Sequence, residues 1–178
     1  MKRMPVTIAV SILLLAASAY LYRRVARHNV AHQVFGGQQL LNALNTADEV
    51  AAQRLHYREG RPKGSDKLDD YVRDEIAPLA AAQALEVKRL LQDASSYDWS
   101  TDSTKSCVLD YGVLLTFRSR QRPVRVALCF NCLTLGIYDG ADDTAKPVHT
   151  AEFDPARKQF TMVIKSIFPT DREIQALR

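Results

Sequence analysis

The sequence lacks the motifs by which many enzymes are recognised. It contains no G-x-S-x-G nucleophile turn, no glycine-rich phosphate-binding loop and no H-E-x-x-H helix. Asp139, Asp142 and Asp143 lie close together but without the D-x-[DN]-x-[DN]-G order of a calcium loop, so they are interpreted as turn residues. These absences favour a non-catalytic protein over an enzyme, and no cofactor and no catalytic residue is expected.

Cysteine is scarce, and its scarcity limits the chemistry available. The chain has three cysteines, Cys107, Cys129 and Cys132. A structural zinc site usually takes four ligands, and neither His56 nor His149 has a spacing that nominates it as the fourth. No metal site is therefore expected, although the three thiols are the candidate site residues.

The C-x-x-C motif at Cys129 and Cys132 falls within a predicted strand, 124–137. Residues three apart in a regular strand are about 10 Å apart, beyond the roughly 7 Å limit between α-carbons for a disulfide. The alternation of apolar residues changes parity inside the motif, which predicts a β-bulge at 129–133. Such a bulge would place both cysteines on the same side, away from the core.

Cys107 begins the preceding strand of the predicted hairpin. It would lie opposite Cys132 to within a residue or two, so a cross-strand disulfide is sterically conceivable. Its alternation with Leu109, Tyr111 and Val113 indicates instead a buried thiol. For Cys129 and Cys132 a structural disulfide or an inert pair is favoured, and metal binding and redox activity stay open; a thioredoxin-like role is disfavoured because the motif is not at a helix N-terminus.

A predominantly apolar stretch of eighteen residues without a charge, 5–22, lies between Lys2-Arg3 and Arg23-Arg24. As a helix it would be about 27 Å long, close to the roughly 30 Å hydrocarbon core of a bilayer. The sequence thus predicts a single-pass anchor in the bacterial inner membrane, in contact with lipid and with the following domain outside the cytoplasm. The alternative is a signal peptide cleaved near Ala19, which leaves a secreted or periplasmic protein.

The net charge of +4 owes much to the basic residues around this stretch, so no nucleic acid partner is expected. A row of arginines in the predicted hairpin is interpreted as a solvated end that protects a strand edge. Its members are Arg118, Arg120, Arg122 and Arg125.

The chain divides into a signal-anchor at 1–24, a juxtamembrane linker at 25–39 and one globular domain at 40–178. An apolar stripe predicts a helix over 40–55, with a strand at 50–55 as the alternative. Further helices are predicted from Pro78 to 91, from Asp154 to 167, and after a Thr170-x-x-Glu173 capping box. A hairpin is predicted at about 107–137 and a surface loop at 58–70. The expected fold class is α+β, a small antiparallel sheet with helices packed on one face, preceded by an N-terminal transmembrane helix.

The segments K-S-C at 105–107, L-C-F-N-C at 128–132 and F-P-T-D-R-E-I-Q at 168–175 form a pattern over the last 75 or so residues. It resembles a pattern of small bacterial exported or membrane-anchored proteins. The resemblance implies no activity, but it implies that the three cysteines belong to one local feature. We therefore expect a membrane-anchored envelope protein whose extracytoplasmic domain is a non-catalytic binding or assembly module; the alternative is a thiol-based redox or metal site.

Overall fold

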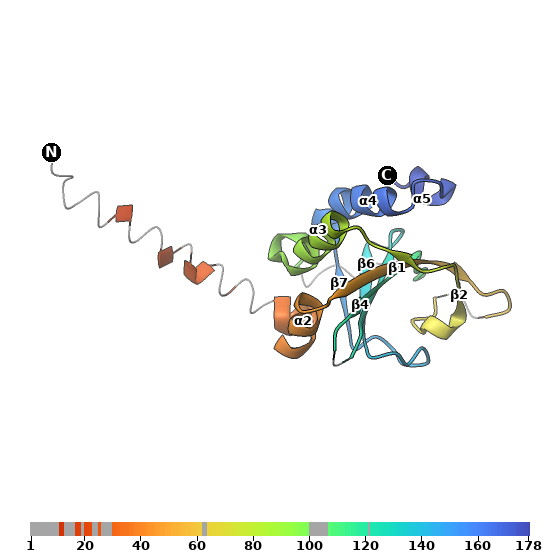
Figure 1. Ribbon diagram of the computed structural model, residues 1–178, viewed down its shortest axis with the longest axis horizontal. Coiled ribbons are helices and arrows are strands. Elements are labelled where there is room, and N and C mark those ends of the chain that lie inside the picture. The colour runs from red at the N-terminus through yellow and green to blue at the C-terminus, as the bar shows by residue number, and fades with distance from the viewer. Residues whose placement is uncertain are drawn as a thin grey trace.

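The strands form one antiparallel sheet. The computed structural model describes residues 11–12, 17–18, 20–22, 25, 30–61, 64–99, 107–120 and 122–178. Within these ranges the sheet has seven strands in the order β2-β1-β4-β5-β6-β7, and β3 also pairs with β1 (Figure 1). The strands are Glu49–Tyr57 (β1), Tyr71–Arg73 (β2), Ala77–Pro78 (β3), Val113–Arg118 (β4), Val124–Cys129 (β5), Thr134–Asp139 (β6) and His149–Glu152 (β7).

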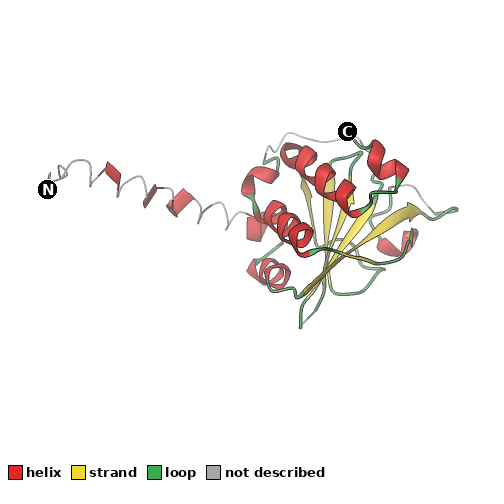
Figure 2. Cartoon of the chain, turned by 45° about the horizontal axis from the view of Figure 1, so that its top comes forward, coloured by secondary structure: helices red, strands yellow, loops and turns green. Residues whose placement is uncertain are grey.

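The longer helices gather on one face of this sheet, as Figure 2 shows. They are Gln38–Asn45 (α2), Ala81–Gln92 (α3), Arg157–Ile167 (α4) and Arg172–Ala176 (α5). A π-helical turn, Val30–Val34 (η1), precedes them, and the 3-10 turns are Leu68–Asp70 (η2), Ala94–Ser96 (η3) and Asp154–Ala156 (η4). The α+β class with helices on one face of an antiparallel sheet is therefore confirmed.

Both faces of the central strands are buried, and alternate residues serve different apolar clusters. In β5, Val124, Val126 and Leu128 pack under the helices, whereas Ala127 and Cys129 face the other side. This alternation follows from the period of two of an extended chain. The second face is covered by tyrosines and by the segment around η2, so the sheet carries a large core on one side and a smaller one on the other.

Strand β1 lies where the sequence favoured a helix over 40–55. The helix α2 ends at Asn45, and the alternative strand is confirmed. The reason is that Val50 and Ala52 belong to the cluster under the helices while Leu55 belongs to the opposite one. A strand buried on both faces has no polar alternation, so its sequence is hard to distinguish from a buried helix.

Helix α3 begins later than predicted. Pro78 is not its first residue but lies in β3, opposite Ala51. The N–H of the following residue, Leu79, donates to the carbonyl of Val50, and the chain turns into the helix only after Ala80, whose N–H donates to Gln83 Oε1 at 2.9 Å. Proline fits this edge position because it has no N–H to offer to a further strand.

The predicted second strand of the hairpin is two strands, β5 and β6, joined by a turn at 130–133. The expected β-bulge is thus wrong, because a complete reversal of the chain produces the change in parity. Leu133 closes the turn with a φ of 55°. The first strand, β4, also begins only at Val113, so residues 107–112 lie outside the regular sheet.

The two C-terminal helices are present, with different first turns. Asp154 and Pro155 form the 3-10 turn η4, which leads into α4. The predicted apolar stripe is buried at Phe160, Val163 and Ile164. Asp171, rather than Thr170, caps α5 by accepting the N–H of Ile174 at 2.9 Å.

The structure corrects one part of the expected fold class, the N-terminal transmembrane helix. A helix that crosses a bilayer needs about 20 apolar residues, and α3, with 12, is the longest in the described part of the chain. No helix among those residues is long and apolar enough to span a membrane. Most of the stretch 1–24, to which that prediction applies, lies outside the described residues.

The linker predicted at 25–39 also differs from the structure in its second half. Val30, Ala31, Val34 and Phe35 are buried within the main apolar cluster. Because these side chains pack against the domain, they are part of its core rather than a solvated connection. Only the glycines after them, Gly36 and Gly37, keep the conformations of a turn.

Candidate functional site

The three cysteines lie together at one end of the sheet. Cys107 and Cys132 form a disulfide with their α-carbons 5.7 Å apart, while Cys129 is a free and fully buried thiol. The prediction of Cys107 as a buried core thiol is wrong: its side chain is exposed. That prediction assumed the alternation of a strand, but residues 107–112 precede β4 and are not part of it. The predicted hairpin register, in contrast, placed Cys107 opposite Cys132 correctly.

Cys129 and Cys132 lie on the same face of the sheet, as expected, although a turn and not a bulge brings them there. The expectation that this side lies away from the core is wrong, since both are buried in the smaller apolar cluster. The Sγ atom of Cys129 accepts hydrogen bonds from two main-chain N–H groups, that of Cys132 at 3.3 Å and that of Asp110 at 3.4 Å. The free thiol therefore contacts both segments that the disulfide joins.

A cavity of about 390 Å³ lies beside this cluster. Its wall is formed by the end of β1, the segment before β4, the turn between β5 and β6, and α5. The lining residues are Arg54, Leu55, His56, Tyr57, Asp110, Gly112, Phe130, Asn131, Glu173, Ile174 and Leu177. Asp110 and Asn131 come from the segments that the three cysteines connect, so the cavity lies next to the cysteine cluster, although no cysteine lines it.

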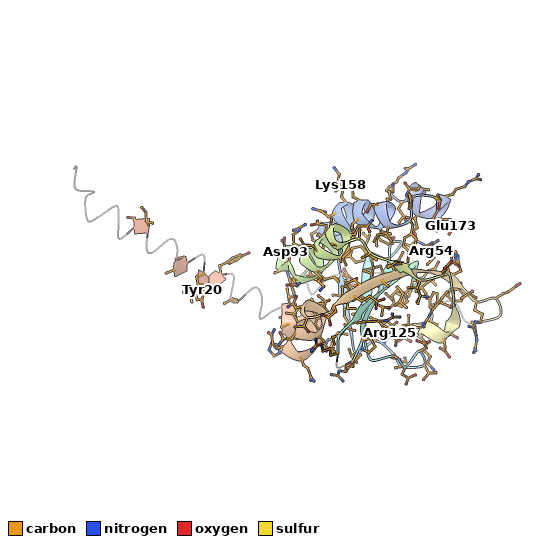
Figure 3. The ribbon with its side chains drawn as sticks, viewed as in Figure 1. Tyr20, Arg54, Asp93, Arg125, Lys158 and Glu173 are labelled. Atoms are coloured by element: carbon orange, nitrogen blue, oxygen red, sulfur yellow. A yellow bond between two sulfur atoms is a disulfide. The ribbon has the colours of Figure 1, made fainter. Side chains whose placement is uncertain are left out.

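Arg54 is the charged residue on which this site is built. Its side chain is only 7% exposed, and its Nε and Nη2 atoms lie 2.6 Å from Asp171 Oδ2 and from Glu173 Oε2. Its Nη1 donates to the carbonyl of Gly112. Figure 3 shows Arg54 and Glu173 side by side at the end of the sheet. A buried guanidinium needs partners for its donors, and here three of its nitrogens have one.

Asp171 has two roles, since it caps α5 and pairs with Arg54. Partial burial of its carboxyl acts to raise the pKa, but the hydrogen bond from the Ile174 N–H and the Arg54 guanidinium outweigh burial, so the pKa of Asp171 lies below its usual range. The carboxylate stays ionised and holds α5 against β1.

His56 and Asp74 form a more exposed pair near the mouth of the cavity, with Nε2 and Oδ2 3.1 Å apart. Asp70, in the predicted surface loop at 58–70, is buried, accepts from Ser65 Oγ and pairs with Arg61. The structure therefore gives Asp70 and Asp74 separate partners.

The arginine row is not uniformly solvated. Arg118 and Arg122 are half exposed and pair with Glu49 and Asp139 across the strands at 3.0 and 2.8 Å. Arg125, however, is buried on the smaller face, where Asp143 binds it together with Arg73 (Figure 3). For Arg125 the interpretation as a solvated hairpin end is wrong.

The sequence drew no attention to Arg54 as a site residue. One signal was present: a charged residue inside the apolar run Val50–Leu55 needs a buried partner if that run is a strand. The partners lie 117 and 119 residues away in a segment that was interpreted only as a helix start. No group of three or more histidine, cysteine or acidic side chains among the described residues is placed to hold a metal ion.

Comparison of the chain with protein-family models, with curated proteins and with solved structures finds no match in any of the three.

Proposed function

We propose that this chain is an exported protein whose α+β domain is a non-catalytic binding or assembly module, with the ligand held in the cavity beside α5. The Cys107–Cys132 disulfide supports export, because structural disulfides persist in oxidising compartments such as the periplasm and the extracellular space.

The observation that carries the proposal is the composition of the cavity wall. Phe130, Ile174 and Leu177 supply apolar groups, the first two of them largely buried. Polar side chains make up the larger part of the wall, namely Arg54, His56, Tyr57, Asp110, Asn131 and Glu173. A concave site in which fixed polar groups stand next to apolar ones can bind and orient a ligand.

The charges of the wall indicate the kind of ligand. The wall carries two carboxylates, those of Asp110 and Glu173, and one guanidinium, that of Arg54. The guanidinium nitrogens already bind Asp171, Glu173 and the carbonyl of Gly112. Glu173 is largely exposed, so it remains accessible to a second partner. The ligand proposed is therefore a peptide segment that presents a positively charged side chain next to an apolar one.

A pair of capped tripeptides, Phe-Gly-Lys and Phe-Gly-Glu, tests this proposal in titrations followed by NMR. The lysine peptide is expected to shift the resonances of Phe130 and Ile174 and to bind more tightly than the glutamate peptide. Because a partly exposed charge pair contributes up to about 1 kcal/mol, Glu173→Gln and Asp110→Asn are each expected to weaken binding by up to about fivefold.

The matched control is Glu59→Gln, which removes the same charge from an exposed residue that does not line the cavity. It is expected to leave affinity for the lysine peptide unchanged. Equal binding of the two peptides, or an equal loss in all three variants, would contradict the proposed ligand class.

A further inference from the structure

The cysteine cluster contains one free thiol and one disulfide, and the thiol contacts the main chain of a disulfide-bonded residue. The Sγ atom of Cys129 lies 3.3 Å from the main-chain nitrogen of Cys132, the residue that carries one half of the disulfide. The turn at 130–133 reverses the chain between them, so the separation of about 10 Å that an extended strand would impose does not apply. The three cysteines thus belong to one local cluster, in which a buried free thiol lies next to the backbone of the disulfide-bonded Cys132.

The surroundings of Cys129 suit an attacking sulfur. The N–H groups of Asp110 and Cys132 both point at its Sγ atom. A thiolate is the species that attacks a disulfide, and fixed main-chain donors stabilise negative charge on the atom at which they are aimed.

The three cysteines differ sharply in exposure. Cys129 and Cys132 are 0% and 4% exposed, whereas Cys107 is an exposed residue. A bond between the two buried cysteines would therefore leave the remaining thiol at the surface, where small molecules can reach it.

We propose that Cys107 is a site of thiol modification that is made available by an internal exchange. The Cys129 thiolate attacks Sγ of Cys132, a Cys129–Cys132 bond forms and the Cys107–Cys132 bond breaks. The electron pair leaves on the Cys107 sulfur, which takes up the proton that Cys129 gave up, so the exchange needs no oxidant or reductant. The exposed Cys107 thiol then gives up this proton to water and, as the thiolate, attacks a low-molecular-weight disulfide, forming a mixed disulfide and releasing one thiolate.

The exchange also changes how the segment before β4 is held. With the Cys107–Cys132 bond broken, this segment keeps its main-chain hydrogen bonds at Gly112, one to Leu128 O at 2.9 Å and one from Leu55 N at 3.0 Å. Asp110, two residues earlier, would lose the covalent tether on its other side.

Tryptic mapping of the oxidised full chain without reductant tests the exchange. The native protein is treated with N-ethylmaleimide and digested. Cleavage after Lys105, Arg118, Arg125 and Arg157 places Cys107 on 106–118 and both other cysteines on 126–157, because Lys146 is followed by Pro147. The expected result is maleimide on Cys107 together with an internal disulfide in 126–157. Oxidised glutathione in place of maleimide is expected to add one glutathionyl group to 106–118.

The matched variant Cys129→Ser removes the attacking sulfur with little change in size, and labelling of Cys107 is expected to be lost. Cys107→Ser tests the product bond directly, since mild oxidation with oxidised glutathione should link Cys129 to Cys132 in the folded variant. Labelling of Cys129 alone, no labelling at all, undiminished labelling of Cys107 in Cys129→Ser, or free thiols in oxidised Cys107→Ser would each overturn the proposal. These readouts report disulfide connectivity and are independent of peptide binding.

Discussion

Gly136 in the middle of β6 is expected to tolerate no side chain. A Cβ atom added there would overlap Tyr111 Oη, and it would lie 3.1 Å from Tyr111 Cζ and 3.3 Å from Pro147 Cβ. Tyr111 is fully buried and cannot move aside easily, because its ring packs between those of Tyr71 and Tyr138, with centroids 5.9 and 6.3 Å away. Gly136→Ala is therefore an overpacking change.

Overpacking a well-filled core by one methyl group lowers the free energy of unfolding by about 1–3 kcal/mol. Because the surroundings of Tyr111 are rigid, we expect a loss of about 2 kcal/mol or more for Gly136→Ala. For a domain of this size, about 2 kcal/mol lowers the melting temperature by roughly 4–8 °C. Urea unfolding followed by circular dichroism measures the free energy, with an unchanged m-value as the sign that the denatured state is unaffected.

A double-mutant cycle with Tyr111→Phe identifies the cause. Removing the hydroxyl removes the closest overlap, so the free energy lost in Gly136→Ala/Tyr111→Phe is expected to be smaller than the sum of the two single changes by about 1 kcal/mol. A stable Gly136→Ala protein, or strict additivity in the cycle, would refute the proposed clash.

Three further predictions concern the ion pairs and the disulfide. Reducing the Cys107–Cys132 disulfide, which spans 25 residues, is expected to lower the free energy of unfolding by about 3 kcal/mol, measured in urea with and without reductant. Asp143 and Asp171 have pKa values below their usual range, because Arg73 and Arg125 outweigh the partial burial of Asp143, and the Ile174 N–H together with Arg54 outweighs that of Asp171. The unfolded chain therefore binds more protons and stability is lost as pH falls below about 4; Asp143→Asn and Asp171→Asn should each make that acid loss shallower. Arg54→Met leaves the Asp171 carboxylate without its partner and should destabilise the domain by about 2–4 kcal/mol, whereas a loss below about 0.5 kcal/mol would mean that the pair is effectively solvated.

The sequence predicts those parts of the fold whose apolar residues keep a clear period. The apolar stripe of α4 recurs with the period of a helix, and in β4 Val113, Leu115 and Phe117 alternate with Leu114 and the polar Thr116, so the C-terminal helix and the hairpin could be identified. β1 lacks such a period, because Val50, Ala51 and Ala52 are apolar in succession, and its apolar run was therefore assigned to a helix.

Candidate site residues could be predicted only where chemistry is visible in a single residue type. Cysteines are rare enough to be noticed, and the three of them lie together in the structure. The pairing of Arg54 with Asp171 depends on a contact between residues 117 positions apart, and nothing local in either segment reveals it. Cys107 shows the limit of parity arguments, since parity holds only where the chain is paired in a ladder, and the ladder begins at Val113.

Each side of the cavity is held by a different kind of interaction. The Cys107–Cys132 disulfide fixes the segment before β4 to the turn that carries Asn131, and the Arg54–Asp171 pair fixes α5 to β1. Main-chain hydrogen bonds hold Gly112 between β1 and β5, where its carbonyl also accepts from Arg54. Gly112 lies five residues after Cys107 in the chain, and its carbonyl accepts a hydrogen bond from Arg54. The disulfide and the Arg54 ion pair are therefore not independent, because a change in the disulfide reaches Arg54 through this backbone. A thiol exchange at one end of the sheet can therefore alter the carboxylates that are proposed to receive the ligand.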